Sequence, residues 1–135
     1  MEQLYYNCVM RIMAIDYGEK RVGIASTDDS GHFALPRAVF PNDDSLLKNI
    51  LSLKLKEGID KIVIGESRNL DGTPNPIMEE IEKFKKELEA GGAEVILHPE
   101  VFTTQEAMRL QGETGMTDAS AAALILKSFL DMYNK

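Results

Sequence analysis

Apolar runs rich in branched residues predict three extended segments at the start of the chain. The first two, residues 9–15 and 21–26, flank a tight turn at 16–20. A third segment covers residues 32–40, and Pro36 marks it as an edge strand or a bulge because proline cannot donate a hydrogen bond to a neighbouring strand. The three segments predict an antiparallel meander.

The period of the pattern then changes to that of a helix. A first helix is expected to begin at residues 42–44, whose Asn and Asp side chains can cap it, and to end at Gly58. Its apolar face is formed by Leu47, Ile50, Leu51 and Leu55. The run KIVIG at 61–65 is typical of a short strand buried on both faces.

The second half of the chain alternates helices and strands. A second helix ends at Gly91, and its apolar face is formed by Ile77, Ile81, Phe84 and Leu88. Residues 94–98 predict a fifth strand, and a short helix is expected after Thr103. The last helix is expected from Thr117 or Asp118 to about Tyr133. The order βββαβαβαα predicts an α/β fold with a mixed five-stranded sheet flanked by helices.

One domain is the expected organisation, because the chain has 135 residues and neither an internal repeat nor a low-complexity linker. Hydrophobic residues make up 44% of the chain, which is enough to bury a core. Its apolar runs are too short to cross a bilayer, and no secretory signal is visible, so we expect a cytoplasmic protein without a membrane partner. The single cysteine, Cys8, excludes an intramolecular disulfide framework.

The charge of the chain limits how it could bind nucleic acid. Its 15 Lys and Arg residues stand against 22 Asp and Glu residues, for a net charge of −7. Proteins that hold nucleic acid by bulk electrostatics are usually basic. Nucleic acid could therefore be bound only through a local basic patch or through metal ions held by carboxylates.

Four acidic residues occupy places where a site could form. Asp16 and Glu66 end predicted strands, Glu100 lies just beyond another, and Asp118 opens the last helix. If the three strands are parallel neighbours, these carboxylates meet at one edge of the sheet, where ligand crevices of α/β proteins lie. Clustered carboxylates need cations, and oxygen ligands suit Mg²⁺ or Mn²⁺.

Each acid also has an ordinary interpretation. Asp118 can be a charge favoured by the helix dipole, and Asp16 can be a turn former. Glu66 and Glu100 can be solvated surface acids. The hypothesis of a site therefore depends on the coincidence of the four positions.

Four blocks of sequence, in order, are similar to the motifs of one known family. IDYGEKRVG at 15–23 resembles the opening motif of the YqgF/RuvX family, bacterial ribonuclease H-like proteins regarded as pre-16S rRNA nucleases or Holliday junction resolvase homologues. VIG at 63–65 with NLDGT at 69–73 resembles the family's loop after the fourth strand. HPEVFTTQEA at 98–107 and TDASAA at 117–122 resemble the block after the fifth strand and the start of the final helix. The similarity extends over residues 10–133.

This resemblance implies a ribonuclease H-like fold and a metal-dependent nuclease that acts on structured nucleic acid. The first expectation is processing of the 5′ end of pre-16S rRNA by phosphodiester hydrolysis, with association with the ribosome. The alternative is a Holliday junction resolvase-like endonuclease that cuts branched DNA. The resemblance places Asp16, Glu100 and Asp118 at the acidic-site positions of the family. Either a monomer or a homodimer is compatible with it.

Two departures from the family pattern concern the acids. The family's fifth-strand block has Asp-Glu-Arg, whereas Pro99 and Val101 flank Glu100 here. Its fourth-strand block continues with apolar residues and proline, whereas this chain has Glu66, and more distant junction-resolving relatives carry an acid at the end of that strand. Glu100, Glu66 or both are therefore expected to hold metal together with Asp16 and Asp118.

The expected chemistry is two-metal hydrolysis with Mg²⁺ or Mn²⁺. Two ions about 4 Å apart would activate the attacking water and stabilise the leaving oxygen, and Asp16 would bridge them. His98 is expected to be a hydrogen-bonded residue at a strand end rather than a general base. The candidate contacts to nucleic acid are basic or polar residues expected near the same edge: Lys20, Arg21, Arg37, Arg68, Asn69 and Thr104.

Two other classes of protein share some of these features. The phosphate loop of actin and sugar-kinase folds also begins with Asp-x-Gly, but those folds need a second domain that 135 residues cannot supply. A non-catalytic nucleic-acid or protein-binding module with a decayed active site would fit Pro99, Val101 and the acidic charge. Residues 1–9 precede the family-like opening, which predicts an N-terminal extension followed by one domain at 10–135.

Overall fold

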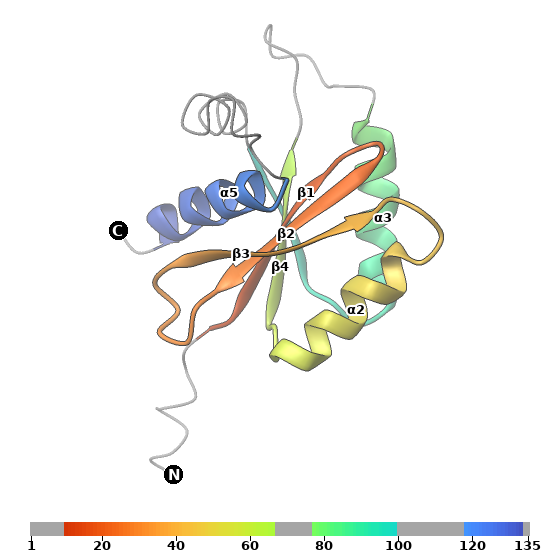
Figure 1. The fold of residues 1–135 in the computed structure, drawn as a ribbon. Helices are drawn as coiled ribbons and strands as arrows, with labels where there is room; N and C mark the ends of the chain where they lie inside the picture. The colour runs from red at the N-terminus through yellow and green to blue at the C-terminus, as the bar shows by residue number, and fades with distance from the viewer. Residues whose placement is uncertain (1–9, 67–76, 100–117, 134–135) are drawn as a thin grey trace, which may run out of the picture.

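The computed structural model describes residues 10–66, 77–99 and 118–133, and these form one five-stranded sheet with three helices packed against it (Figure 1). The strands lie in the order β3-β2-β1-β4-β5. Their bounds are β1 Ile12–Tyr17, β2 Arg21–Thr27, β3 Ala34–Pro41, β4 Lys61–Glu66 and β5 Val95–Pro99. The predicted mixed α/β fold is confirmed.

The first three strands form the expected meander, with β1 antiparallel to β2 and β2 antiparallel to β3. The other two pairs are parallel, β1 with β4 and β4 with β5. β1 is therefore the central strand, and the carboxyl ends of β1, β4 and β5 share one edge of the sheet. At the opposite margin, β3 is an edge strand, and Pro36 pairs with Ala25 while Ala38 pairs with Ile24. Arg37 is the extra residue of the bulge between them.

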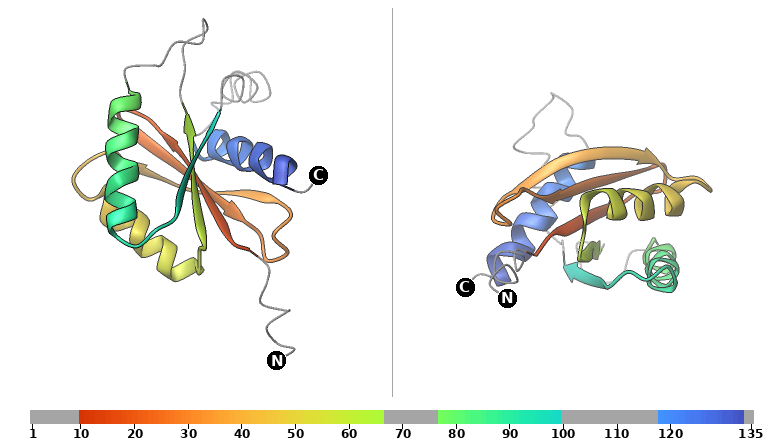
Figure 2. Two further views of the ribbon diagram at one scale, coloured as in Figure 1. Left: turned by 180° about the vertical axis from the view of Figure 1, so that it is seen from behind. Right: turned by 90° about the horizontal axis from the view of Figure 1, so that it is seen from below.

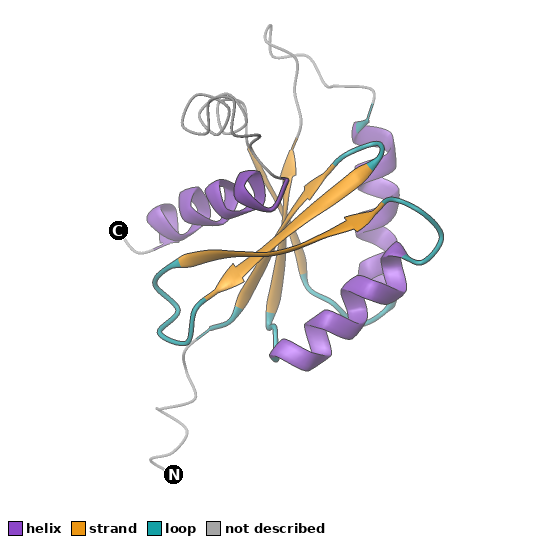
Figure 3. Cartoon of the chain, in the orientation of Figure 1, coloured by secondary structure: helices purple, strands orange, loops and turns teal. Residues whose placement is uncertain are grey.

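The helices cover both faces of the sheet (Figures 2 and 3). α2 (Leu46–Glu57) and α3 (Met78–Ala90) lie on one face, which we call the α2/α3 face. α5 (Asp118–Tyr133) lies on the other, which we call the α5 face. The short helix predicted after Thr103 lies outside the described residues.

Two apolar clusters show which strand residues point to each face. On the α2/α3 face, Met13, Ile15, Ile62 and Ile64 pack with Ile50 and Ile81 of the helices, all of them fully buried. On the α5 face, Ile12, Ala14, Ala25 and Val63 pack with Ala122, Ile125 and Leu126. Alternate residues of one strand point to opposite faces, so these clusters fix the direction of the side chains that follow them.

The predicted apolar face of α2 is partly wrong. Leu55 is 82% exposed, whereas Leu46, which is not part of the predicted face, is 2% exposed. At about 100° per residue Leu55 lies about 140° around the helix from the buried Ile50, while Leu46 lies about 40° from it. The helix starts one residue after Ser45, and Asp43 accepts hydrogen bonds from the Ser45 backbone N (2.9 Å) and Oγ (2.6 Å). Gly58 ends the helix in the left-handed conformation, as expected.

Deleting residues 1–9 is expected to leave the fold intact. The start of the described chain is held by two hydrogen bonds between Arg11 and Asp60. The Arg11 backbone N donates to Asp60 Oδ2 (3.0 Å), and the Arg11 carbonyl accepts from the Asp60 backbone N (2.7 Å). Thermal unfolding of the shortened protein should give a Tm within about 2 °C of the full chain. A larger loss would show that these residues contribute to the stability of β1.

No helix in the described part of the chain combines the length and apolar character needed to cross a membrane.

Candidate functional site

Asp16 is the next-to-last residue of the central strand. It pairs with Gly23 of β2 and is half-buried. Ile12 and Ala14, two and four positions earlier, belong to the cluster beneath α5. Strand alternation therefore directs Asp16 to the α5 face, at the edge of the sheet where β1 and β4 end.

Asp118 is the first residue of α5, so the helix begins at one of the predicted acids. Ala122, one turn later, is fully buried in the cluster that contains Ala14 and Val63. Four helical residues span about 6 Å, so the start of α5 lies about that far beyond the part of the helix that packs on β1 and β4. In Figure 1, and from behind in Figure 2, α5 begins over the middle of the sheet. The fold thus brings the start of α5 to the face of Asp16.

Glu66, the last residue of β4, points to the other face. Ile62 and Ile64 precede it by four and two positions, and both belong to the α2/α3 cluster. The parallel register pairs Ile15 with Ile64, so the two strands run side by side up to one residue before Asp16 and two before Glu66. Alternation therefore places Glu66 and Asp16 on opposite faces, although their strands are neighbours.

Ile96 and His98, the residues of β5 that precede Glu100 by four and two positions, point to the α5 face. Ile96 packs against the α5 cluster, and His98 contacts two residues of α5 itself. Glu100 lies outside the described residues, two positions after His98. Pro99 belongs to β5 and pairs with Glu66, so the strand extends one residue further than predicted.

The turn between β1 and β2 carries Lys20 and Arg21, both exposed and both close in sequence to Asp16. The turn is held by Asn42, whose Nδ2 donates to the Gly18 carbonyl (2.7 Å) and whose backbone N donates to the Lys20 carbonyl (2.9 Å). From the sequence, Asn42 is expected only as a candidate helix cap. Its position 24 residues from Gly18 gave no sign of this contact.

Gly18→Ala is expected to distort this turn. A Cβ at residue 18 would lie 2.5 Å from the Arg21 carbonyl oxygen, which is backbone and cannot rotate away. The variant should lose about 1–3 kcal/mol of unfolding free energy, measured by urea denaturation. Gly58→Ala is a contrasting variant, because its difficulty is the φ of 67° and not crowding by backbone. Gly18→Ala with unchanged stability would show that the turn relaxes freely.

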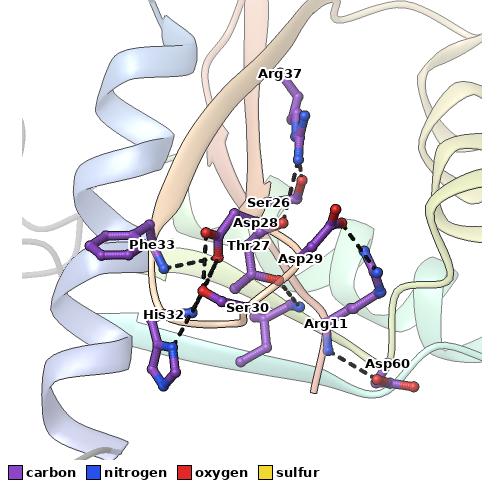
Figure 4. A network of polar contacts seen from close by, with 11 residues as sticks. Arg11, Ser26, Thr27, Asp28, Asp29, Ser30, His32, Phe33, Arg37 and Asp60 are labelled. Atoms are coloured by element: carbon purple, nitrogen blue, oxygen red, sulfur yellow. Dashed lines mark hydrogen bonds and ion pairs between the residues drawn. The ribbon is translucent and has the colours of Figure 1, made fainter. Parts of the chain in front are cut away.

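Arg37 does not lie beside Asp16, contrary to the position expected for it. Its Nε donates to Ser26 Oγ (2.7 Å) and its Nη2 to the Thr27 carbonyl (3.4 Å), at the far end of β2 (Figure 4). Ser26 pairs with Met13, which belongs to the α2/α3 cluster. Pro36 indicated an edge strand or a bulge, and the structure has both, with the bulge at the neighbouring Arg37. The sequence did not indicate that the Arg37 side chain would bond Ser26 and Thr27. Arg68, Asn69 and Thr104 lie outside the described residues.

His98 is a buried, hydrogen-bonded residue at the end of a strand, as predicted. It is 5% exposed, and its Nε2 lies 2.9 Å from Ser128 Oγ. Burial lowers the pKa of His98 from its ordinary value of 6.5. The folded protein therefore favours the neutral imidazole.

The stability of the protein should therefore contain a pH-dependent contribution from His98. Above the unfolded-state pKa of 6.5 both states hold a neutral ring, so the contribution is complete. As the pH falls below that value the unfolded state takes up a proton first, and stability is lost until the folded state is protonated too. Urea denaturation at pH 7.5, 6.5 and 5.5 should show a steeper loss for the wild type than for His98→Gln. Equal slopes would contradict the shift.

Within the described residues, no group of three Asp, Glu, His or Cys side chains lies close enough to hold a metal ion. A cleft of about 160 Å³ lies beside Tyr17 and Phe84, lined also by Glu80, Lys83 and Glu87 of α3. Tyr17 is one position from Asp16 and belongs to the α2/α3 face, so this cleft is separate from the acidic edge.

The fold has known counterparts. At TM-scores of 0.61 and 0.57, the chain matches structures described as "T. thermophilus RuvC in complex with Holliday junction substrate" and "Crystal structure of Fowlpox virus resolvase and substrate Holliday junction DNA complex". The first match covers 93% of this chain and 96% of the other at 13% identity, and the second covers 93% and 100% at 14%. With the sheet order and the flanking helices, these matches define a ribonuclease H-like α/β protein.

Sequence comparison identifies the family. The sequence model of RuvX, described as "Holliday junction resolvase", matches residues 10–132. A protein of Syntrophus aciditrophicus (strain SB) is 38% identical over 90% of this chain and 89% of its own, and one of Chlorobium phaeobacteroides (strain BS1) is 33% identical over 91% and 93%. Both are named "Putative pre-16S rRNA nuclease". The chain belongs to the RuvX family, a nuclease family by the names of its members, as its motifs predict.

Proposed function

We propose that this protein is a metal-dependent nuclease that hydrolyses phosphodiester bonds in structured nucleic acid. The observation that carries the proposal is the placement of Asp16. It is the next-to-last residue of the central strand and points to the face covered by the helix that begins at Asp118, in a chain that belongs to the RuvX family. Both acids match the family's motif positions in sequence.

The donors available at this edge fit hard divalent cations. Carboxylate oxygens are the ligands that Mg²⁺ and Mn²⁺ prefer, and we assign Asp16, Asp118 and Glu100 to hold them. Bound ions would supply activation of a water and charge stabilisation at the cleaved phosphate. The half-buried position of Asp16 on a central strand gives its carboxylate a fixed direction, which a flexible surface acid would lack.

The β1–β2 turn provides the local positive charge that an acidic chain needs in order to bind nucleic acid. Lys20 and Arg21 are exposed and follow Asp16 by four and five positions, and Asn42 and Gly18 hold the turn in place. We propose that these two residues contact phosphates that flank the cleaved bond. Phosphate contacts position a nucleic acid without reading its sequence, so they suit a substrate recognised by its shape.

The favoured substrate is the 5′ region of pre-16S rRNA, because the relatives that match most of this chain are named for it. A four-way DNA junction is the second candidate, because the matching family is described as a Holliday junction resolvase. Action on pre-rRNA would place the protein in the cytoplasm and in association with the ribosome. Whether a monomer or a homodimer acts is part of the same test.

The test offers the purified protein three substrates at equal concentration: an RNA with the 16S 5′ leader, a four-way DNA junction and a linear duplex. Reactions contain Mg²⁺, Mn²⁺ or EDTA, and light scattering gives the oligomeric state. We expect metal-dependent cleavage of the RNA leader and none in EDTA. Preferred cleavage of the junction would support the second candidate. Binding without cleavage of any substrate would contradict an enzyme and favour a binding module.

A further inference from the structure

A partly buried polar link joins the end of β5 to α5, and the function described above does not use it. His98 Nε2 lies 2.9 Å from Ser128 Oγ, 30 positions away in the chain. The edge of the His98 ring also meets Phe129, with ring centroids 5.7 Å apart and planes at 89°. His98 is 5% and Phe129 4% exposed, so their ring contact is shielded from water, whereas Ser128 is half-buried.

Near its start, α5 meets the central strands through small side chains that give little directional constraint, whereas the larger Ile125 and Leu126 lie closer to Ser128 along the helix. The first two turns of the helix present small side chains, including the buried Ala119, Ala121 and Ala122. The sheet beneath presents Ala14 and Ala25. Burial of apolar surface stabilises such an interface without fixing a direction, whereas a hydrogen bond depends on distance and angle. The link at Ser128 is therefore suited to set the angle of α5 on the sheet.

Small changes of this angle would have large effects at the helix start. Ser128 lies ten residues from Asp118, which corresponds to about 15 Å of helix. A tilt of about 10° around Ser128 would move the start of α5 by about 2.6 Å. Misplacement of a reacting group by about 1 Å can lower a rate about 100-fold.

We infer that His98 and Ser128 form a positioning pair that holds the start of α5 in place over Asp16. The inference rests on the proposed nuclease site at this edge. Neither residue touches the substrate. Their hydrogen bond fixes the orientation of α5 against β5. The orientation of α5 in turn sets where its first residue, Asp118, lies relative to the central strand.

Four variants separate positioning from simple stabilisation. His98→Leu leaves the half-buried Ser128 hydroxyl without this partner, and Ser128→Ala leaves the buried His98 ring without it, so both should lower Tm. The double variant His98→Leu/Ser128→Ala has no unsatisfied partner, and its Tm should return toward the wild type. His98→Gln can keep an amide near the position of Nε2 and so retain the bond. The matched controls are His32→Gln and Ser52→Ala, since both residues are exposed and neither belongs to β5 or α5.

The measurements are Tm, Mn²⁺ affinity by calorimetry, and kcat and KM on the cleaved substrate. We expect the double variant to recover Tm but to keep a kcat about 10- to 100-fold below the wild type, with KM within about twofold and weaker Mn²⁺ binding. His98→Gln and both controls should keep a wild-type kcat. If kcat recovers together with Tm in the double variant, the link only stabilises the fold and the inference is wrong.

Two further outcomes are decisive. If the double variant does not fold, Ser128→Thr replaces it, because threonine keeps the hydroxyl. A normal kcat then supports the inference, and a kcat as low as that of Ser128→Ala overturns it. A wild-type protein that neither cleaves nor binds Mn²⁺ overturns the proposed function and the inference together, whereas wild-type cleavage with a fully active double variant overturns the inference alone.

Discussion

Asp16→Asn is expected to lower metal-dependent cleavage by several orders of magnitude while the protein remains folded. Asparagine keeps the shape of the side chain and removes the charge that would hold the metal ions. Because the substitution also removes repulsion among neighbouring carboxylates, the unfolding free energy should stay the same or rise. Single-turnover rates on the substrate cleaved by the wild type, together with thermal unfolding, measure both effects.

Glu19→Gln is the matched control for this variant. Glu19 is exposed in the turn that follows Asp16, and its substitution removes the same charge three positions away. We expect the control to keep a wild-type rate. Equal rates for Asp16→Asn and the wild type, after parallel purification that excludes a contaminating nuclease, would remove Asp16 from the site.

The strands and the longer helices could be predicted from the sequence because burial leaves a regular pattern there. Residues 62–65 are buried without interruption, as expected for a strand between two helical layers. In α3 the predicted stripe of Ile81, Phe84 and Leu88 is buried. In both cases a single face or a single run accounts for all the apolar residues, so the pattern has only one interpretation.

α2 could be predicted as a helix, although its orientation could not. It contains leucines all around its circumference, and both Leu46 and Leu55 could have belonged to the buried face. Which of the two leucines is buried depends on how Ile50 packs on the strands beneath the helix. Asn42 shows a second limit, because its polar side chain suits a helix cap equally well. Only the structure, in which the β1–β2 turn lies next to residue 42, shows that Asn42 donates to the Gly18 carbonyl instead.

The sequence indicated that Asp16 and the start of α5 lie near the carboxyl edge of the sheet, and the structure has both on one face there; their role as a site stays a prediction. The sequence did not show which face Glu66 would occupy, because that depends on the register between β1 and β4. Pro36 indicated an edge strand or a bulge, but not that Arg37 beside it would bond Ser26 and Thr27. A histidine bonded at the end of β5 was expected, but its partner Ser128 depends on how α5 crosses the sheet.

The sheet faces to which Glu66 and His98 point predict a second large effect, on metal binding. Glu66 follows Ile64 by two positions and points to the α2/α3 face, away from Asp16. Glu100 follows His98 by two positions, and His98 contacts α5, the helix that begins at Asp118. The resemblance of residues 98–107 to the family's motif also implies a ligand at Glu100. Both arguments favour Glu100 over Glu66 as the partner of Asp16, whereas the sequence alone left the two open.

We therefore expect Glu100→Gln to weaken Mn²⁺ binding by at least about tenfold, since removing a group that merely orients a ligand already costs tenfold to a hundredfold. Glu66→Gln should bind Mn²⁺ as the wild type does, and so should the control Glu82→Gln on the exposed side of α3. Titration calorimetry with Mn²⁺ on the three variants measures this, and circular dichroism checks that each is folded. If only Glu66→Gln weakens binding, strand alternation has failed at the end of β4 and the family position is wrong for this protein. If neither variant does, the acidic edge does not hold metal through residue 66 or 100, and a binding module becomes the better interpretation of the fold.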